Sequence, residues 1–204
     1  MNDNSFDSEA PSEDSFDDEK DTNHQTDKEK TKNVSDDEKH SISSNDLNLI
    51  TSISNTLITL IEKNKKLPDY KEMLKIQSKL IFSAKTIPSI SIKDYLIRIK
   101  NYSKVEKSTL ILALILIDHP CKNADLMVTY YNIHRLLFGA ILVAIKFNED
   151  KNYENSFYAE IAGVKPKELK LIELEFLELI QFKLFVRFSE YEQYRIHLEE
   201  PNKE

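Results

Sequence analysis

The sequence contains little cysteine, little glycine and no long apolar stretch. Cys121 is the single cysteine, which excludes an internal disulfide and any metal site built from several cysteines. The two glycines, Gly139 and Gly163, are too few to build a glycine-rich phosphate-binding loop. The longest apolar stretch, residues 136–145, is far shorter than the roughly 18 residues of a membrane-spanning helix. We therefore expect no membrane insertion.

The acidity of the chain is concentrated at its beginning. Residues 1–45 carry fourteen Asp or Glu and five Lys, which leaves 21 of the 35 acids and 23 of the 28 bases for the remainder. Low hydrophobicity with excess charge cannot offset the entropy of ordering, so residues 1–45 are predicted to be a disordered acidic tail. We expect one globular domain over residues 46–198 and a disordered end over residues 199–204. No basic start precedes an apolar run, so an intracellular location, cytoplasm or nucleus, is expected.

The apolar patterns indicate an all-α domain, because alternating strand patterns are scarce. A first helix is predicted to begin with Asp46 as its cap. A second helix is expected over residues 70–84 and a third over residues 91–102. The residues 103–106 match a capping box and predict the start of the next helix, which Pro120 is expected to end.

The segment 132–147 predicts a helix that is apolar on nearly all sides, which is typical of a helix at the centre of a domain. Gly139 costs roughly 1 kcal/mol relative to alanine in a helix interior and therefore indicates close approach of another backbone. Lys146 stands in the last turn, on the same side as Gly139. A lysine that extends to water from a core helix is the simplest explanation.

A second displaced charge argues against that explanation. The segment 169–180 predicts a helix whose apolar stripe runs through Leu169, Ile172 and Phe176, and Glu173 falls in the middle of this stripe. Charged residues are seldom buried without a partner. Lys146 and Glu173 are therefore expected to pair, either with each other or with groups on another protein.

At this point the residues resemble a known family, the cyclins, and in particular the P/U-type cyclins related to the yeast phosphate-pathway cyclins. Each motif alone carries little information, whereas their order is specific. The resemblance covers about residues 46–198 and rests on the runs 88–99, 112–118, 132–137, 144–150, 155–159, 163–164, 168–169, 174–177 and 181–184.

The resemblance implies a fold and a function. The fold is a cyclin box of five helices, with an additional N-terminal helix and a short C-terminal helix. The function is that of a regulatory subunit that forms a heterodimer with a cyclin-dependent kinase and activates it, without cofactor, metal or catalysis of its own. In that family the cyclin pushes a mobile helix of the kinase inward and so aligns the groups that transfer the phosphoryl group.

The family's kinase-contacting positions map onto this sequence residue by residue. Lys146 and Glu173 match the two charged positions that contact the kinase near its mobile helix. For some of the apolar residues, Phe147, Leu177 and Phe182, a role in the core fits the sequence equally well. The apolar contact positions, with Glu149 at their rim, map onto Val143, Phe147, Leu177, Phe182 and Leu184.

Other functions fit the sequence less well. His134 belongs to no recognisable nucleophile set, which disfavours an enzyme. The cyclin fold resembles general transcription factors, but the near-neutral domain has no basic face for nucleic acid. The remaining alternative is a helical adaptor that kept the fold without activating a kinase. The substrate-docking motif Met-Arg-x-Ile-Leu of other cyclins is absent, since Tyr95–Ile99 stands in its place, and the kinase, substrate and pathway (cell cycle or phosphate signalling) stay open.

Overall fold

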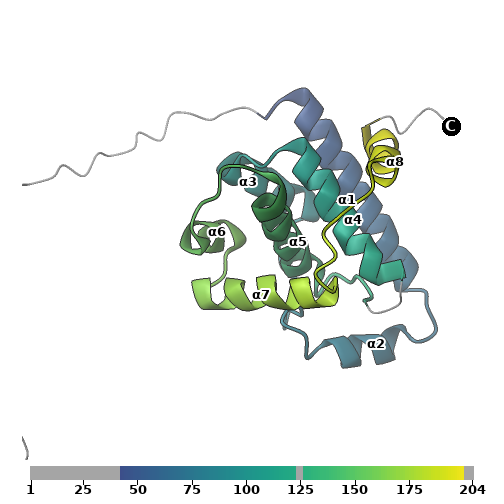
Figure 1. Cartoon of the computed structure of the whole chain (residues 1–204). Coiled ribbons are helices and arrows are strands. Elements are labelled where there is room, and N and C mark those ends of the chain that lie inside the picture. Colours follow the sequence, from purple (N-terminus) through teal and green to yellow (C-terminus); the bar gives the residue numbers. More distant parts are fainter. Residues whose placement is uncertain (1–41, 123–125, 200–204) are drawn as a thin grey trace, which may run out of the picture. The chain divides into compact units, whose positions relative to one another are not determined.

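A computed structural model describes residues 42–122 and 126–199, and within them the regular secondary structure is helical, without a strand. The all-α prediction is confirmed. Five helices, α3 to α7, form the predicted box, α1 and α2 precede it and the short α8 follows it (Figure 1). Helix α2 is shorter than the predicted range of residues 70–84, since it ends at Gln77. The described helices are α1 (Ser44–Asn64), α2 (Tyr70–Gln77), α3 (Ile92–Ser103), α4 (Lys107–Lys122), α5 (Ile133–Asn148), α6 (Asn155–Ala162), α7 (Pro166–Leu179) and α8 (Phe188–Glu199).

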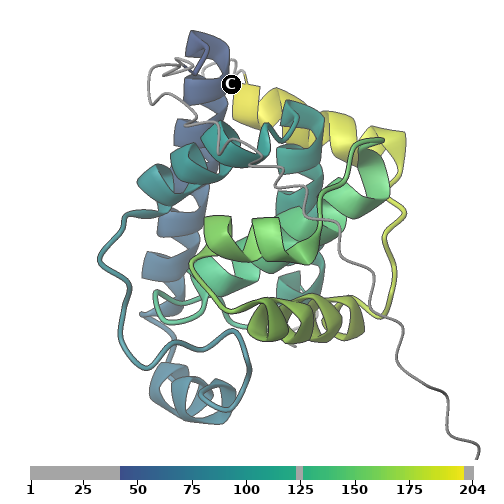
Figure 2. The ribbon, with the colours of Figure 1, turned by 90° about the vertical axis from the view of Figure 1, so that its left-hand side faces the viewer.

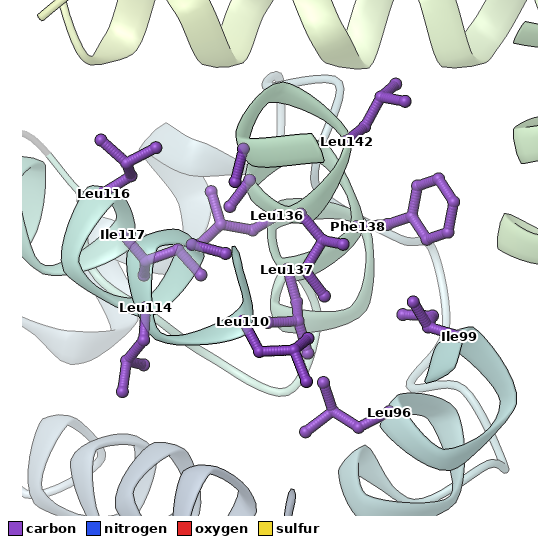
Figure 3. Packing of buried hydrophobic residues seen from close by; sticks show 14 of the residues in the cluster. Leu96, Ile99, Leu110, Leu114, Leu116, Ile117, Leu136, Leu137, Phe138 and Leu142 are labelled. Atoms are coloured by element: carbon purple, nitrogen blue, oxygen red, sulfur yellow. The ribbon is translucent and has the colours of Figure 1, made fainter. Parts of the chain in front are cut away.

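Helix α5 lies at the centre of the domain, as its sequence predicts. It packs against α3, α4, α6 and α7, and twelve of its sixteen residues are buried. Figure 2 shows the same helices from the side. Side chains of α3 and α4 meet those of α5 in the core, and the labelled ones are Leu96, Ile99, Leu110, Leu114, Leu116, Ile117, Leu136, Leu137, Phe138 and Leu142 (Figure 3).

Gly139 marks the crossing of α5 and α7. A Cβ atom at Gly139 would lie 3.0 Å from Ile172 Cγ2 and 3.6 Å from both the Ile172 carbonyl oxygen and Phe176 Cβ. The predicted close approach of another backbone is confirmed, because α7 occupies the space that a side chain would need. This crossing brings the last turn of α5 beside the middle of α7.

Two helix starts differ from the sequence prediction. The cap of α1 is Ser43, whose Oγ accepts a hydrogen bond from the Asp46 backbone N–H at 3.1 Å, so the helix begins two residues before the predicted cap. The predicted capping box at residues 103–106 is wrong. Helix α3 extends to Ser103, and Lys104 then takes a left-handed conformation with φ 56°. A distant carboxylate, Glu149 Oε1, instead accepts the Glu106 N–H at 2.9 Å just before α4 begins.

The predicted end of α4 at Pro120 is also wrong, because the helix continues to Lys122. A proline in the last turn removes one backbone donor, and a helix can tolerate this near its end. Within residues 42–122 and 126–199, no helix combines the length and the apolar character needed to cross a membrane. Residues 1–41 of the predicted tail (1–45) and residues 200–204 of the predicted end (199–204) lie outside the described residues, whereas Ser44 and Asn45 belong to α1 and Glu199 belongs to α8.

Candidate functional site

Lys146 and Glu173 meet at the surface where α5 passes α7. Lys146 Nζ lies 2.7 Å from Glu173 Oε1 and 2.8 Å from Glu173 Oε2. The lysine comes from the last turn of α5 and the glutamate from the middle of α7, 27 positions further along the chain. Of the two alternatives left open by the sequence, the structure shows the first: these two side chains pair with each other.

Asn155 completes this charged cluster from a third helix. Its Oδ1 accepts a hydrogen bond from Lys146 Nζ at 2.8 Å, and its Nδ2 donates to Glu173 Oε2 at 3.2 Å. Asn155 is the first residue of α6, so the cluster of Lys146, Glu173 and Asn155 joins three helices. Asn155 stands in the run 155–159 that carries the family resemblance, but neither a displaced charge nor an apolar pattern marks it as a site residue in the sequence.

The cluster is partly buried but still accessible to a partner. The Glu173 side chain is 17% exposed and the Lys146 side chain is 32% exposed. A carboxylate offers about four lone-pair sites. Lys146 and Asn155 occupy three of them, one on Oε1 and two on Oε2. Glu173 Oε1 therefore keeps capacity for a further donor, such as a backbone N–H of another protein.

Two of the apolar candidates, Phe147 and Phe182, lie on the surface. Phe147 follows Lys146 on α5 and is 53% exposed, and Phe182 is 61% exposed. For these two residues the alternative of a purely core role is wrong. Leu177 and Leu184 are partly buried and pack against the core, and Val143 is buried at 3% exposure. Val143 therefore belongs to the core and not to the exposed surface.

Phe182 is turned outward by the way α7 ends. The Phe182 N–H donates to the Leu177 carbonyl at 2.8 Å and the Gln181 N–H donates to the Glu178 carbonyl at 2.9 Å. These two bonds form a Schellman motif, whose left-handed position usually holds glycine. Here Gln181 and Phe182 both adopt it, with φ 54° and 56°. Each left-handed residue other than glycine costs about 1 kcal/mol, so this conformation depends on the surrounding packing.

Glu149 has a structural role as well as a position near the candidate surface. Its side chain accepts the Glu106 backbone N–H across a separation of 43 residues and so ties the end of α5 to the start of α4. The residue is neither fully buried nor fully exposed. Any contact of Glu149 with a partner would therefore share the carboxylate with this bond.

His134 lies in the core rather than in a site. It is 8% exposed, its Nε2 is 2.9 Å from the Ile90 carbonyl oxygen, and its ring packs against Tyr95. Burial lowers the pKa of His134 more than this hydrogen bond raises it. In residues 42–122 and 126–199 no group of three or more His, Cys, Asp or Glu side chains is placed to hold a metal ion.

Comparisons with known proteins relate this sequence to one family model and to several plant proteins. Residues 12–184 match the family model described as "Cyclin". Cyclin-U2-1 of Arabidopsis thaliana is 37% identical over 159 residues, which cover 76% of this chain and 70% of the relative. Cyclin-U4-2 of the same plant is 38% identical over 149 residues, covering 72% of this chain and 68% of the relative. Cyclin-P2-1 of Oryza sativa subsp. japonica is 38% identical over 118 residues, or 58% and 54% of the two chains.

Proposed function

Because the chain belongs to the cyclin family and is similar to its plant U-type and P-type members, we propose that it binds and activates a cyclin-dependent protein kinase. The chain acts as a regulatory subunit in a heterodimer and performs no chemistry itself. It needs no cofactor and works inside the cell.

The charged cluster of Lys146, Glu173 and Asn155 is the observation that supports this proposal most. The resemblance maps two of its members, Lys146 and Glu173, onto the family's charged kinase contacts, and hydrogen bonds hold both side chains in place before any partner binds. Preorganised polar groups cost less to order on binding. Phe147, the residue after Lys146, and Phe182, just beyond the end of α7, are exposed, and exposed aromatic side chains are typical anchors of protein interfaces.

Activation follows from where such a partner would sit. A kinase helix placed against this surface would displace water from the exposed rings. One of its N–H groups would donate a hydrogen bond to the free lone pair of Glu173 Oε1. In a cyclin-dependent kinase, inward movement of the mobile helix aligns the Lys–Glu pair and the metal-binding segment of the kinase. The cyclin would then contribute only binding energy, which stabilises the active conformation of the kinase relative to the inactive one.

The test is reconstitution. The full chain is purified from its native cell with the kinase that accompanies it, the kinase is identified by mass spectrometry, and both are then produced separately. Adding the full chain to the isolated kinase should form a stable 1:1 complex and raise phosphorylation of a peptide substrate. A complex without increased phosphorylation would favour the adaptor alternative, and failure of the two purified proteins to associate would overturn the proposal.

A further inference from the structure

The segment between α7 and α8, residues 180–187, and the first residue of α8 expose three phenylalanine rings. Phe185 is 81% exposed and Phe188, the first residue of α8, is 78% exposed. Together with Phe182 these rings leave roughly 300–500 Å² of apolar surface in water. Large exposed aromatic side chains that gather in one short segment are typical of an interaction site. We call residues 182–188 the aromatic strip.

The aromatic strip is held to the rest of the domain at both ends, so its rings have defined positions on the surface. The Schellman motif holds Phe182 at the end of α7. Leu184 and Val186 point inward and pack against the core. At the other end, Glu190 Oε1 lies 2.9 Å from His119 Nε2 and ties α8 to α4. Figures 1 and 2 show this segment running along the outside of the helices from α7 to α8.

Two cations stand between the exposed rings. Lys183 and Arg187 are both exposed. Among residues 42–122 and 126–199, neither is within ion-pair distance of a carboxylate. The Lys183 Nζ donates to the neighbouring Gln181 side chain at 2.8 Å. A basic and aromatic surface of this kind is complementary to a segment that combines acidic and apolar residues.

We propose that the aromatic strip extends the kinase interface and binds an acidic, apolar segment of the same kinase. This inference rests on the proposed function. Phe182 belongs both to the candidate site and to the strip, and an extended chain places Phe185 within about 10 Å of it. A partner that covers Phe182 is therefore next to Phe185. A standard interface covers about 800 Å² on each partner, which accommodates the charged cluster and the strip together.

The experiment measures affinity of the full chain for the kinase identified by reconstitution. The double variant Phe185→Ala/Phe188→Ala should weaken binding at least about tenfold, because two aromatic anchors are removed. Tyr102→Ala is the matched control, since Tyr102 is an aromatic residue on α3 with 66% exposure; it should leave the affinity unchanged. Thermal unfolding should be the same for all three proteins, because the altered side chains are mostly in water.

A second pair of measurements tests the charge. Lys183→Ala/Arg187→Ala should slow association and make it less sensitive to salt, as expected when rim charges steer an acidic partner. Unchanged affinity of Phe185→Ala/Phe188→Ala, with binding lost in Lys146→Ala/Glu173→Ala, would overturn the strip proposal and leave the proposed function standing. A second result would also overturn the strip proposal: the unaltered chain self-associates, and Phe185→Ala/Phe188→Ala abolishes this self-association without weakening kinase binding. The strip would then join two copies of this chain.

Discussion

The charged cluster predicts that Lys146 and Glu173 matter far more for kinase binding than for folding. Lys146→Ala leaves Glu173 with one donor, the Asn155 amide, and Glu173→Ala leaves Lys146 with one acceptor, the Asn155 carbonyl oxygen. In the complex, removing one member of a buried hydrogen-bonded charge pair costs about 2–5 kcal/mol. This corresponds to a loss of affinity of roughly 30-fold or more.

The cost for the isolated chain is smaller. The Lys146 side chain is 32% exposed, and partly solvated ion pairs contribute only about 0–1 kcal/mol to stability. For a chain of this size, 1 kcal/mol shifts the midpoint of thermal unfolding by about 2–4 °C. Lys146→Ala and Glu173→Ala should therefore stay folded while they bind the kinase weakly.

Titration calorimetry on the two single variants and the double variant measures the loss of binding free energy and the coupling energy between Lys146 and Glu173. Because the two side chains are in direct contact, we expect a coupling of about 0.5–3 kcal/mol. Asn155→Ala should weaken binding less than either, since the Lys146–Glu173 pair survives without its third member. It should nevertheless move in the same direction.

Two lysines elsewhere serve as controls. Lys151 is exposed in the loop before α6, and Lys65 forms a 2.8 Å pair with Glu62 on α1, away from the site. Alanine at either position should leave kinase affinity unchanged. If Lys146→Ala and Glu173→Ala also bind and activate the kinase like the unaltered chain, the assignment of this surface is wrong and the adaptor alternative gains.

Three further predictions follow from the fold. Gly139→Val should lower the free energy of unfolding by about 1–3 kcal/mol in urea titrations, because added methyl groups would meet Ile172 at the α5–α7 crossing; equal or greater stability would contradict this crossing. Burial lowers the pKa of His134 from 6.5, so the unfolded chain binds its proton more readily. The free energy of unfolding should fall as the pH drops below about 6.5, less so in His134→Asn, and an identical pH dependence of both proteins would refute a lowered pKa at His134. A chain beginning at His40 keeps the Ser43 cap and should bind the kinase within about tenfold of full-length affinity, since the acidic tail has no apolar face to contribute; a larger loss would assign the tail a role in binding.

The pattern of the sequence was informative where a single helix decides the answer. The apolar character of residues 132–147 was sufficient to predict a central helix, because a helix without a polar face cannot lie at the surface. The same reasoning singled out Lys146 and Glu173, since each interrupts an apolar face. Gly139 indicates a crossing point, because glycine in a helix interior is unfavourable without a packing reason, and α7 crosses α5 there.

The sequence pattern predicted the wrong helix boundary where the end of one helix and the start of the next lie within the same few residues. Ser103 and Glu106 have the spacing of a capping box, yet α3 extends through Ser103 and the Ser103 Oγ accepts the Val105 N–H at 3.3 Å instead. The Glu106 N–H then finds Glu149. A four-residue motif does not determine whether its first residue ends one helix or caps the next, because that depends on how both helices pack.

The sequence by itself determined the helical class, the central helix and the two displaced charges, because these depend on the periodicity of single segments. The tertiary structure decided which partner each charge has and that Asn155 joins them. It also decided which phenylalanines are exposed to solvent, namely Phe147, Phe182, Phe185 and Phe188. Periodicity gives the direction in which a side chain leaves its helix. Its depth and its neighbours depend on the positions and crossing angles of other helices, which become defined when the whole domain packs.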